Sequence, residues 1–209
     1  MLKLYYAPNA CSLASHIALE DCGAPYESVR LNLRAGDQDA PAYRALNPKG
    51  RVPALVTDNG VLTESAVILG FIAHDFPQLA KPGGFFAFSQ MQDFNIFLAS
   101  SVHIAFAHLF RPGRFADGEA AAAAMRAKLP EALGELFGLI EAQLAGGRPW
   151  VHGDHYTVSD PYLFVFARWL ERDGAGGSAR FPLTRAHRSR MNERPALLKV
   201  LAAEGIAPL

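Results

Sequence analysis

The chain has 209 residues, half of them apolar, and its 20 Lys and Arg side chains balance 20 Asp and Glu side chains. A neutral chain gives no reason to expect a nucleic acid or an anionic membrane as partner. Two cysteines without framework spacing indicate a reducing compartment, not a disulfide-stabilised secreted domain. We find no signal-peptide pattern and no apolar run long enough to cross a bilayer, so we expect a cytoplasmic protein.

The first 22 residues change period within a short stretch. Leu2–Tyr6 alternates as a strand does, Pro8 breaks the pattern, and helical spacing begins at Leu13. Cys11 and Ser12 therefore lie where a strand ends and a helix begins. The partial positive charge of a helix N-terminus lowers the pKa of a thiol and favours the thiolate of a bound small molecule. The alternative is that Cys11 is only a small buried residue.

The remainder of the first 75 residues predicts three more strands and two helices. The strands are 26–31, 54–57 and 61–63, and the helices are 39–46 and 66–75. Asn59-Gly60 between two apolar runs predicts a hairpin. Pro53 at the start of a strand indicates a turn, a sheet edge, or a cis Val52–Pro53 peptide that leaves the Val52 backbone free to pair with an extended ligand.

Glu64 and Ser65 open the helix predicted over 66–75. Ser65 suits a helix cap, and Glu64 lies at the positive end of the helix. Capping is the simpler interpretation of this pair, and ligand binding is the alternative.

The second part of the chain is predicted to be helical throughout. After a Pro- and Gly-rich segment around residues 76–84, apolar residues recur at helical spacing. The expected helices are 88–110, 119–144 with Pro130 as a point of kinking or interruption, 161–170, 180–192 and 195–203. Thr157 and Asp160 form an acidic capping box at the start of the helix over 161–170.

Four motifs occur in one order along the chain. They are Tyr5-Tyr6-x-Pro8-x-Ala10-Cys11-Ser12-Leu13, Asn47-Pro48-x-Gly50-x-Val52-Pro53-Ala54-Leu55, Leu62-Thr63-Glu64-Ser65 and Gly153-Asp154-x-x-Thr157-Val158-x-Asp160. Together they resemble a cytosolic glutathione S-transferase, and the Cys11-Ser12 pair is most similar to the bacterial beta class.

The resemblance implies an α/β N-terminal thioredoxin-like domain and an all-α C-terminal domain. We expect the glutathione-binding domain at 1–77, a linker at 78–87, and at 88–209 a helical domain that forms most of the electrophile pocket. The resemblance also implies a homodimer.

The same resemblance assigns roles to individual residues. Val52 offers its backbone N–H and C=O to the cysteinyl part of glutathione, with Pro53 cis. Glu64 accepts from the γ-glutamyl ammonium, and Ser65 holds the γ-glutamyl carboxylate. Cys11 lies near the glutathione sulfur, where it forms a mixed disulfide or donates a hydrogen bond to the thiolate. We therefore predict Cys11 and its neighbour Ser12 as the catalytic pair.

The helical domain is expected to add polar contacts from Ser100 and His103, and an electrophile pocket lined by Phe106, Phe110 and Trp169. The alternatives are that His103 is a surface histidine and that the three aromatic residues belong to the core.

Two expected glutathione contacts are absent from the sequence. The loop after the second strand lacks a lysine, for which Arg34 or Arg51 can substitute, and Ile96 stands where an asparagine is expected, next to Asn95.

The predicted function is conjugation of the glutathione thiolate to apolar electrophiles. Glutathione is then a co-substrate, and we expect no metal and no tightly bound cofactor. One alternative is monothiol disulfide reduction through Cys11, since there is no Cys-x-x-Cys pair. Another is a non-catalytic protein that binds glutathione or hydrophobic ligands.

Overall fold

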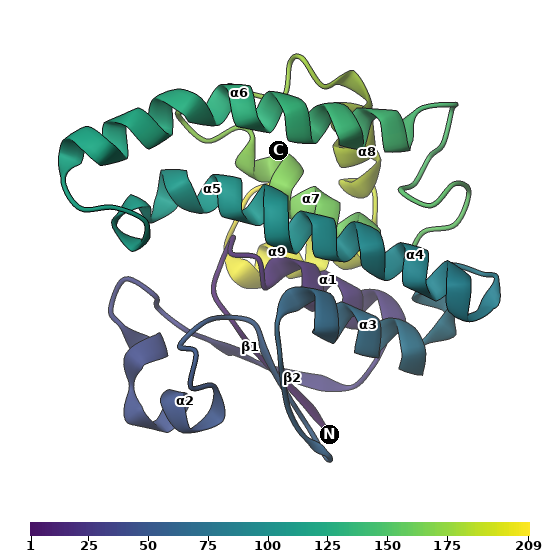
Figure 1. Ribbon diagram of the computed structural model, residues 1–209. Helices are drawn as coiled ribbons and strands as arrows, with labels where there is room; N and C mark the ends of the chain where they lie inside the picture. The colour runs from purple at the N-terminus through teal and green to yellow at the C-terminus, as the bar shows by residue number, and fades with distance from the viewer.

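The N-terminal part of the protein is a four-stranded sheet with three helices. The computed structural model describes residues 1–209 (Figure 1). The elements of this part are β1 (Leu2–Tyr6), α1 (Leu13–Cys22), β2 (Tyr26–Arg30), α2 (Pro41–Leu46), β3 (Ala54–Thr57), β4 (Gly60–Thr63) and α3 (Ser65–Asp75). Their order matches the prediction, with bounds that differ by one or two residues.

The sheet has the order β2-β1-β3-β4. Strand β1 pairs in parallel with β2 and antiparallel with β3, and β3 pairs with β4 through a tight hairpin in which Thr57 faces Gly60. The hairpin predicted from Asn59-Gly60 is therefore confirmed. A parallel pair needs a crossover connection, and α1 supplies it.

Helices α1 and α3 pack between the sheet and the helical part, and α2 lies apart from them (Figure 1). A small apolar cluster fixes α2 through Tyr43, which packs with Leu31 and Val52. The Tyr43 hydroxyl also donates a hydrogen bond to the Arg51 carbonyl oxygen (2.6 Å). Helix α2 therefore holds the loop before β3 in place.

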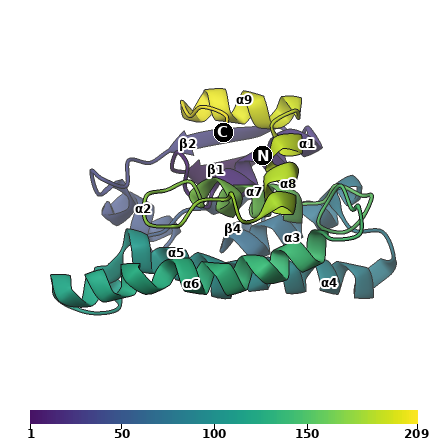
Figure 2. The same cartoon turned by 90° about the horizontal axis from the view of Figure 1, so that it is seen from above.

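The C-terminal part is all helical, so the predicted combination of an α/β part with an all-α part is confirmed. Seen from above, α4, α5 and α6 lie along one side and α9 along the other (Figure 2). The first helix begins at Gly84, so the last residues of the predicted linker are helical. The helices are α4 (Gly84–Phe97), α5 (His103–Phe110), α6 (Glu119–Leu144), α7 (Ser159–Trp169), α8 (Pro182–Met191) and α9 (Pro195–Glu204).

Helices α4 and α5 form one continuous helix, Gly84–Phe110, joined by the π-helical turn Leu98–Val102. This helix is long and apolar enough to cross a membrane, so the expectation that no apolar run has this length is wrong. The core helix of a soluble protein meets the same criterion. Here Met91 and Phe106 are fully buried in the apolar core of the protein.

Helix α7 is the central helix of this part, and every one of its residues is buried. The predicted capping box forms at its start: the Thr157 N–H donates to Asp160 Oδ2 (2.7 Å). Asp160 Oδ1 also accepts the Val151 N–H (2.9 Å) and contacts His187 Nε2 (3.0 Å). Because a buried carboxylate needs such partners, this network fixes both the start of α7 and its neighbours.

The last helix, α9, is tied to the loop that follows β1. Glu204 at its end is buried, and its two oxygens contact His16 Nδ1 (2.8 Å) and the Asn9 N–H (2.9 Å). Asn9 has a φ of 56°, which is uncommon outside glycine. Trp169 of α7 donates its Nε1–H to the Asn9 carbonyl oxygen (3.1 Å). Residues from α1, α7 and α9 therefore fix this loop together.

We predict that Glu204→Ala destabilises the protein by about 3 kcal/mol, because it leaves the partly buried Asn9 N–H and the buried His16 without a partner. Urea unfolding measures the change. The control is Glu193→Ala, an exposed residue without a side-chain partner, which should change stability by less than about 0.5 kcal/mol. Equal stability of the two variants would contradict the role given to Glu204.

Candidate functional site

A cavity of about 690 Å³ lies between the loops at one end of the sheet and helices α5 and α7. A second cavity, of about 460 Å³ between α1, β2 and α9, contains none of the predicted site residues. The first cavity is lined by most of them: Cys11, Arg51, Val52, Pro53, Glu64, Ser65, His103, Phe110 and Trp169. The structure thus brings together residues from distant parts of the sequence.

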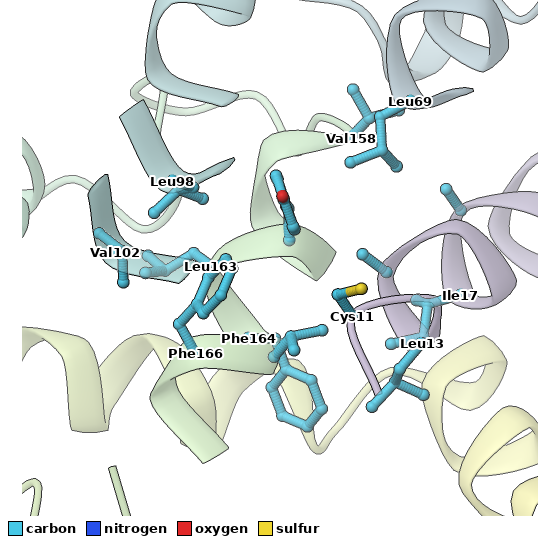
Figure 3. Packing of buried hydrophobic residues seen from close by; sticks show 14 of the residues in the cluster. Cys11, Leu13, Ile17, Leu69, Leu98, Val102, Val158, Leu163, Phe164 and Phe166 are labelled. Carbon is cyan, nitrogen blue, oxygen red and sulfur yellow. The ribbon is translucent and has the colours of Figure 1, made fainter. Parts of the chain in front are cut away.

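Cys11 lies in the loop just before α1, as the change of period predicts, among buried side chains of α1 and α7 (Figure 3). Only 8% of its surface is exposed. Its Sγ donates a hydrogen bond to the Val52 carbonyl oxygen (3.3 Å). Cys11 is therefore both a buried residue and a wall of the cavity.

The expectation that the pKa of Cys11 is lowered is wrong for this structure. Burial raises the pKa of the Cys11 thiol, since the charged thiolate loses its water. The Ser65 hydroxyl and, more weakly, the Arg111 guanidinium lower the pKa but do not reverse the effect. Cys11 is therefore a neutral thiol that donates a hydrogen bond.

The loop before β3 presents the Val52 backbone to the cavity. The Val52–Pro53 peptide is cis, which confirms one of the alternatives derived from the sequence. Val52 lies just before β3, whose residues pair with β1 and β4, so the Val52 backbone is outside these pairs. The Asn47 side chain donates to the Arg51 carbonyl oxygen (2.7 Å), and this bond fixes the loop.

Glu64 and Ser65 stand where β4 meets the N-terminus of α3. Glu64 has a φ of 72°, and backbone strain of this kind is concentrated at functional sites. Its side chain makes no capping hydrogen bond, which argues against the capping interpretation. Instead, Lys49 Nζ contacts Glu64 Oε1 (2.6 Å) and donates to Thr63 Oγ1 (2.9 Å).

His103 begins α5, immediately after the π-helical turn, and faces the cavity. Its ring packs against Trp169, with 5.3 Å between ring centroids, and against Phe166. Burial, together with the weaker effect of the positive charges of Arg51, Arg111 and Arg114, lowers the pKa of His103 to about 4. The imidazole is therefore neutral at physiological pH.

Three predicted site residues do not reach the cavity. The buried Ser12 hydroxyl accepts the Ala7 N–H (3.1 Å) and contacts the Ala7 carbonyl oxygen (3.3 Å), so it braces the loop. Ser100 is exposed and donates to the Ile96 carbonyl oxygen within its own helix (2.8 Å). Phe106 is fully buried and stacks against Phe110, so it supports the cavity wall from behind.

Other residues line the cavity that the sequence did not assign to it. Arg34 and Arg51, named as substitutes for the absent lysine, both line it, whereas Asn95 is buried outside it. Lys49 lies within the Asn47-Pro48 motif, and this position could have indicated that it lines the site. No local sequence pattern indicated the lining residues of the helical part. The unassigned lining residues include Lys49, Thr63, Ile96, Ala99, Ile104, Ala107, Arg111, Arg114, Tyr162 and Arg172.

Comparison with known proteins identifies the family. Residues 1–74 match the model of the glutathione S-transferase N-terminal domain, and residues 97–195 match that of the C-terminal domain. Glutathione S-transferase GstA of Escherichia coli O157:H7 is 33% identical, over 98% of this chain and all of that protein. The chain belongs to the glutathione S-transferase family.

Solved structures agree with this assignment. A Sulfitobacter glutathione transferase homologue with bound glutathione superimposes with a TM-score of 0.89, at 34% identity and 99% coverage of both chains. A bacterial beta-class glutathione S-transferase from Sphingomonas chungbukensis gives 0.83 at 32% identity, covering 98% of this chain and all of the other. The family and fold inferred from the four ordered motifs are confirmed.

We predict that the His103 imidazole of this transferase stays neutral down to pH about 4, whereas the unfolded chain protonates it near pH 6.5. Because the unfolded state then binds more protons, stability falls as the pH falls through this window. NMR titration of the imidazole signals measures the pKa directly, and His103→Gln identifies the resonance. In urea unfolding, the same variant should lose less stability between pH 6.5 and 4 than the wild type. A His103 resonance that titrates near pH 6.5 would contradict the prediction.

Proposed function

We propose that this protein conjugates the thiolate of glutathione, its co-substrate, to an electrophile with an apolar reacting part. One observation carries the proposal: a single cavity has Cys11, the Val52 backbone and the start of α3 on one side, and Phe110 and Trp169 on the other. A site that holds two reactants side by side lowers the barrier by fixing their orientation.

The groups on the N-terminal side match the charges of glutathione. The γ-glutamyl carboxylate is placed at the N-terminus of α3, beside the Ser65 hydroxyl, where backbone N–H groups favour an anion. The γ-glutamyl ammonium takes the place of the Lys49 ammonium as the partner of the Glu64 carboxylate. Lys49 and Glu64 are both about half exposed, so their ion pair costs little to break. The cysteinyl part pairs with the Val52 backbone, which places its sulfur near Cys11.

In this arrangement Cys11 acts as a hydrogen-bond donor. The thiolate of glutathione is the nucleophile, so it must be favoured over the thiol. The neutral Cys11 Sγ–H, now directed at the Val52 carbonyl, can turn to donate to that thiolate. Hydrogen bonding to the charged form lowers its pKa.

Monothiol disulfide reduction is the second candidate, because Cys11 lines the cavity. The raised pKa of Cys11 makes it a poor attacking group at neutral pH, which favours conjugation.

A homodimer and a cytoplasmic location complete the proposal. Exposed apolar side chains on neighbouring helices support association of two copies: Val67 on α3, and Phe85 and Phe86 on α4. Light scattering of the purified protein measures the oligomeric state. The cytoplasmic location remains a prediction from the sequence.

We predict that Cys11→Ala lowers kcat/KM for conjugation of 1-chloro-2,4-dinitrobenzene only about fivefold, the value of one neutral hydrogen bond. The same variant should abolish any reduction of a glutathione mixed disulfide. Both rates are measured on wild type and variant. Loss of conjugation together with disulfide reduction would make Cys11 the reacting group. A wild type that binds glutathione and catalyses neither reaction would support the binding-protein alternative.

We predict that Glu64→Gln raises the Kd for glutathione by about 10- to 100-fold, because a charge-assisted hydrogen bond to the ammonium is weakened. Isothermal titration calorimetry measures the Kd. Glu131→Gln on α6, which removes an exposed carboxylate paired only with Lys128, serves as the control and should leave the Kd unchanged. If the two variants have the same Kd for glutathione, Glu64 does not hold the ammonium.

A further inference from the structure

The cavity concentrates positive charge in a chain whose charges balance. Only one carboxylate lines it, that of Glu64, and Lys49 is already bonded to this group. Six cationic side chains line the same cavity: Arg34, Lys49, Arg51, Arg111, Arg114 and Arg172. A cavity of one sign attracts ligands of the other sign.

These cations divide between the two sides of the cavity. Arg34, Lys49 and Arg51 belong to the N-terminal part, where they are available to the carboxylates of glutathione. Arg111 and Arg114 follow α5, and Arg172 follows α7. The helical part therefore contributes three guanidinium groups on the electrophile side.

The three guanidinium groups on the helical side have no carboxylate of their own. The arginine ion pairs of the structure are formed by other residues: Arg44, Arg126, Arg188 and Arg194. The field of Arg111 and Arg114 reaches the floor of the cavity, where it helps to keep His103 neutral. Unpaired guanidinium groups around a cavity form a ready site for a carboxylate, which arginine binds in bidentate fashion.

An apolar wall lies next to these arginines. The rings of Phe110 and Trp169 meet edge to face, with 5.1 Å between centroids, and both line the cavity with Ile104 and Ala107. Phe110 directly precedes Arg111 in the sequence. This side of the cavity is therefore apolar along one wall and cationic at the adjoining end.

We propose that the electrophile subsite takes an anionic electrophile: an aromatic or unsaturated body that contacts Phe110 and Trp169, with a carboxylate held by Arg111 and Arg114. This inference rests on the proposed conjugation and refines it, because an uncharged apolar electrophile leaves the arginines without a partner.

The probe is 4-chloro-3,5-dinitrobenzoate, compared with its neutral carboxamide. In each case the glutathione sulfur forms a bond to the ring carbon that carries chlorine. Chloride then leaves with the electron pair of the C–Cl bond, and the thiol proton passes to solvent. The two probes differ in charge but react at the same carbon, and each rate is divided by its uncatalysed rate.

The wild type should favour the carboxylate probe over the carboxamide by at least about tenfold in corrected kcat/KM, the value of one charge-assisted contact. The Arg111→Gln/Arg114→Gln double variant should bring this ratio close to one. Arg185→Gln, which removes an exposed positive charge on α8 away from the cavity, should leave both rates unchanged. A wild-type ratio near one, or a preference that survives the double variant, would overturn the proposal.

A binding measurement tests the anionic subsite independently of the proposed conjugation. The glutathione conjugates of the two probes are prepared chemically and titrated by calorimetry into wild type and double variant. Tighter binding of the carboxylate conjugate, lost in the double variant, supports the anionic subsite even if neither probe is turned over, and only the proposed conjugation then fails. Equal binding of the two conjugates to the wild type overturns the anionic subsite, whatever the rates.

Discussion

The buried carboxylate of Glu204 is the contact on which the geometry of the site depends. It joins the end of the last helix to Asn9 and His16, on either side of Cys11. Carboxylate and imidazole are both almost completely shielded from water, so each needs the other as a partner. Trp169 holds the Asn9 carbonyl oxygen from α7. The loop that carries Cys11 is therefore positioned by the helical part as much as by its own strand.

Local patterns in the sequence were sufficient for most of the fold. Alternation predicted β1, the Asn59-Gly60 pair predicted the hairpin, and helical spacing predicted α6 with Pro130 inside it. The capping box of Thr157 and Asp160 was readable because its partners are only three residues apart. Each of these features depends on neighbours in the chain, so periodicity and turn chemistry determine them.

The site was harder to predict where a role depends on distant contacts. Ser12 has the residue type and position of a catalytic hydroxyl, yet its hydroxyl is hydrogen-bonded to the Ala7 backbone. Phe106 and Phe110 share a helix face, but one is core and the other cavity wall, because Phe137 and Phe166 enclose only Phe106. The direction predicted for the pKa shift of Cys11 was also wrong. A helix terminus predicts a lower pKa, but burial against α7 outweighs that effect and cannot be read from the local sequence.

Balanced composition concealed the electrostatics of the cavity in the same way. Equal numbers of acidic and basic residues gave no hint of an anionic ligand, because most acids pair or lie elsewhere while six cations meet at one cavity. Fixed positive charges in a partly enclosed site stabilise an anion without reorganisation at the moment of reaction. The nucleophile proposed here is itself an anion, and Arg111 already acts on the sulfur of Cys11. The same guanidinium can therefore favour the glutathione thiolate and hold a carboxylate on the electrophile, which places both reactants within one positive field.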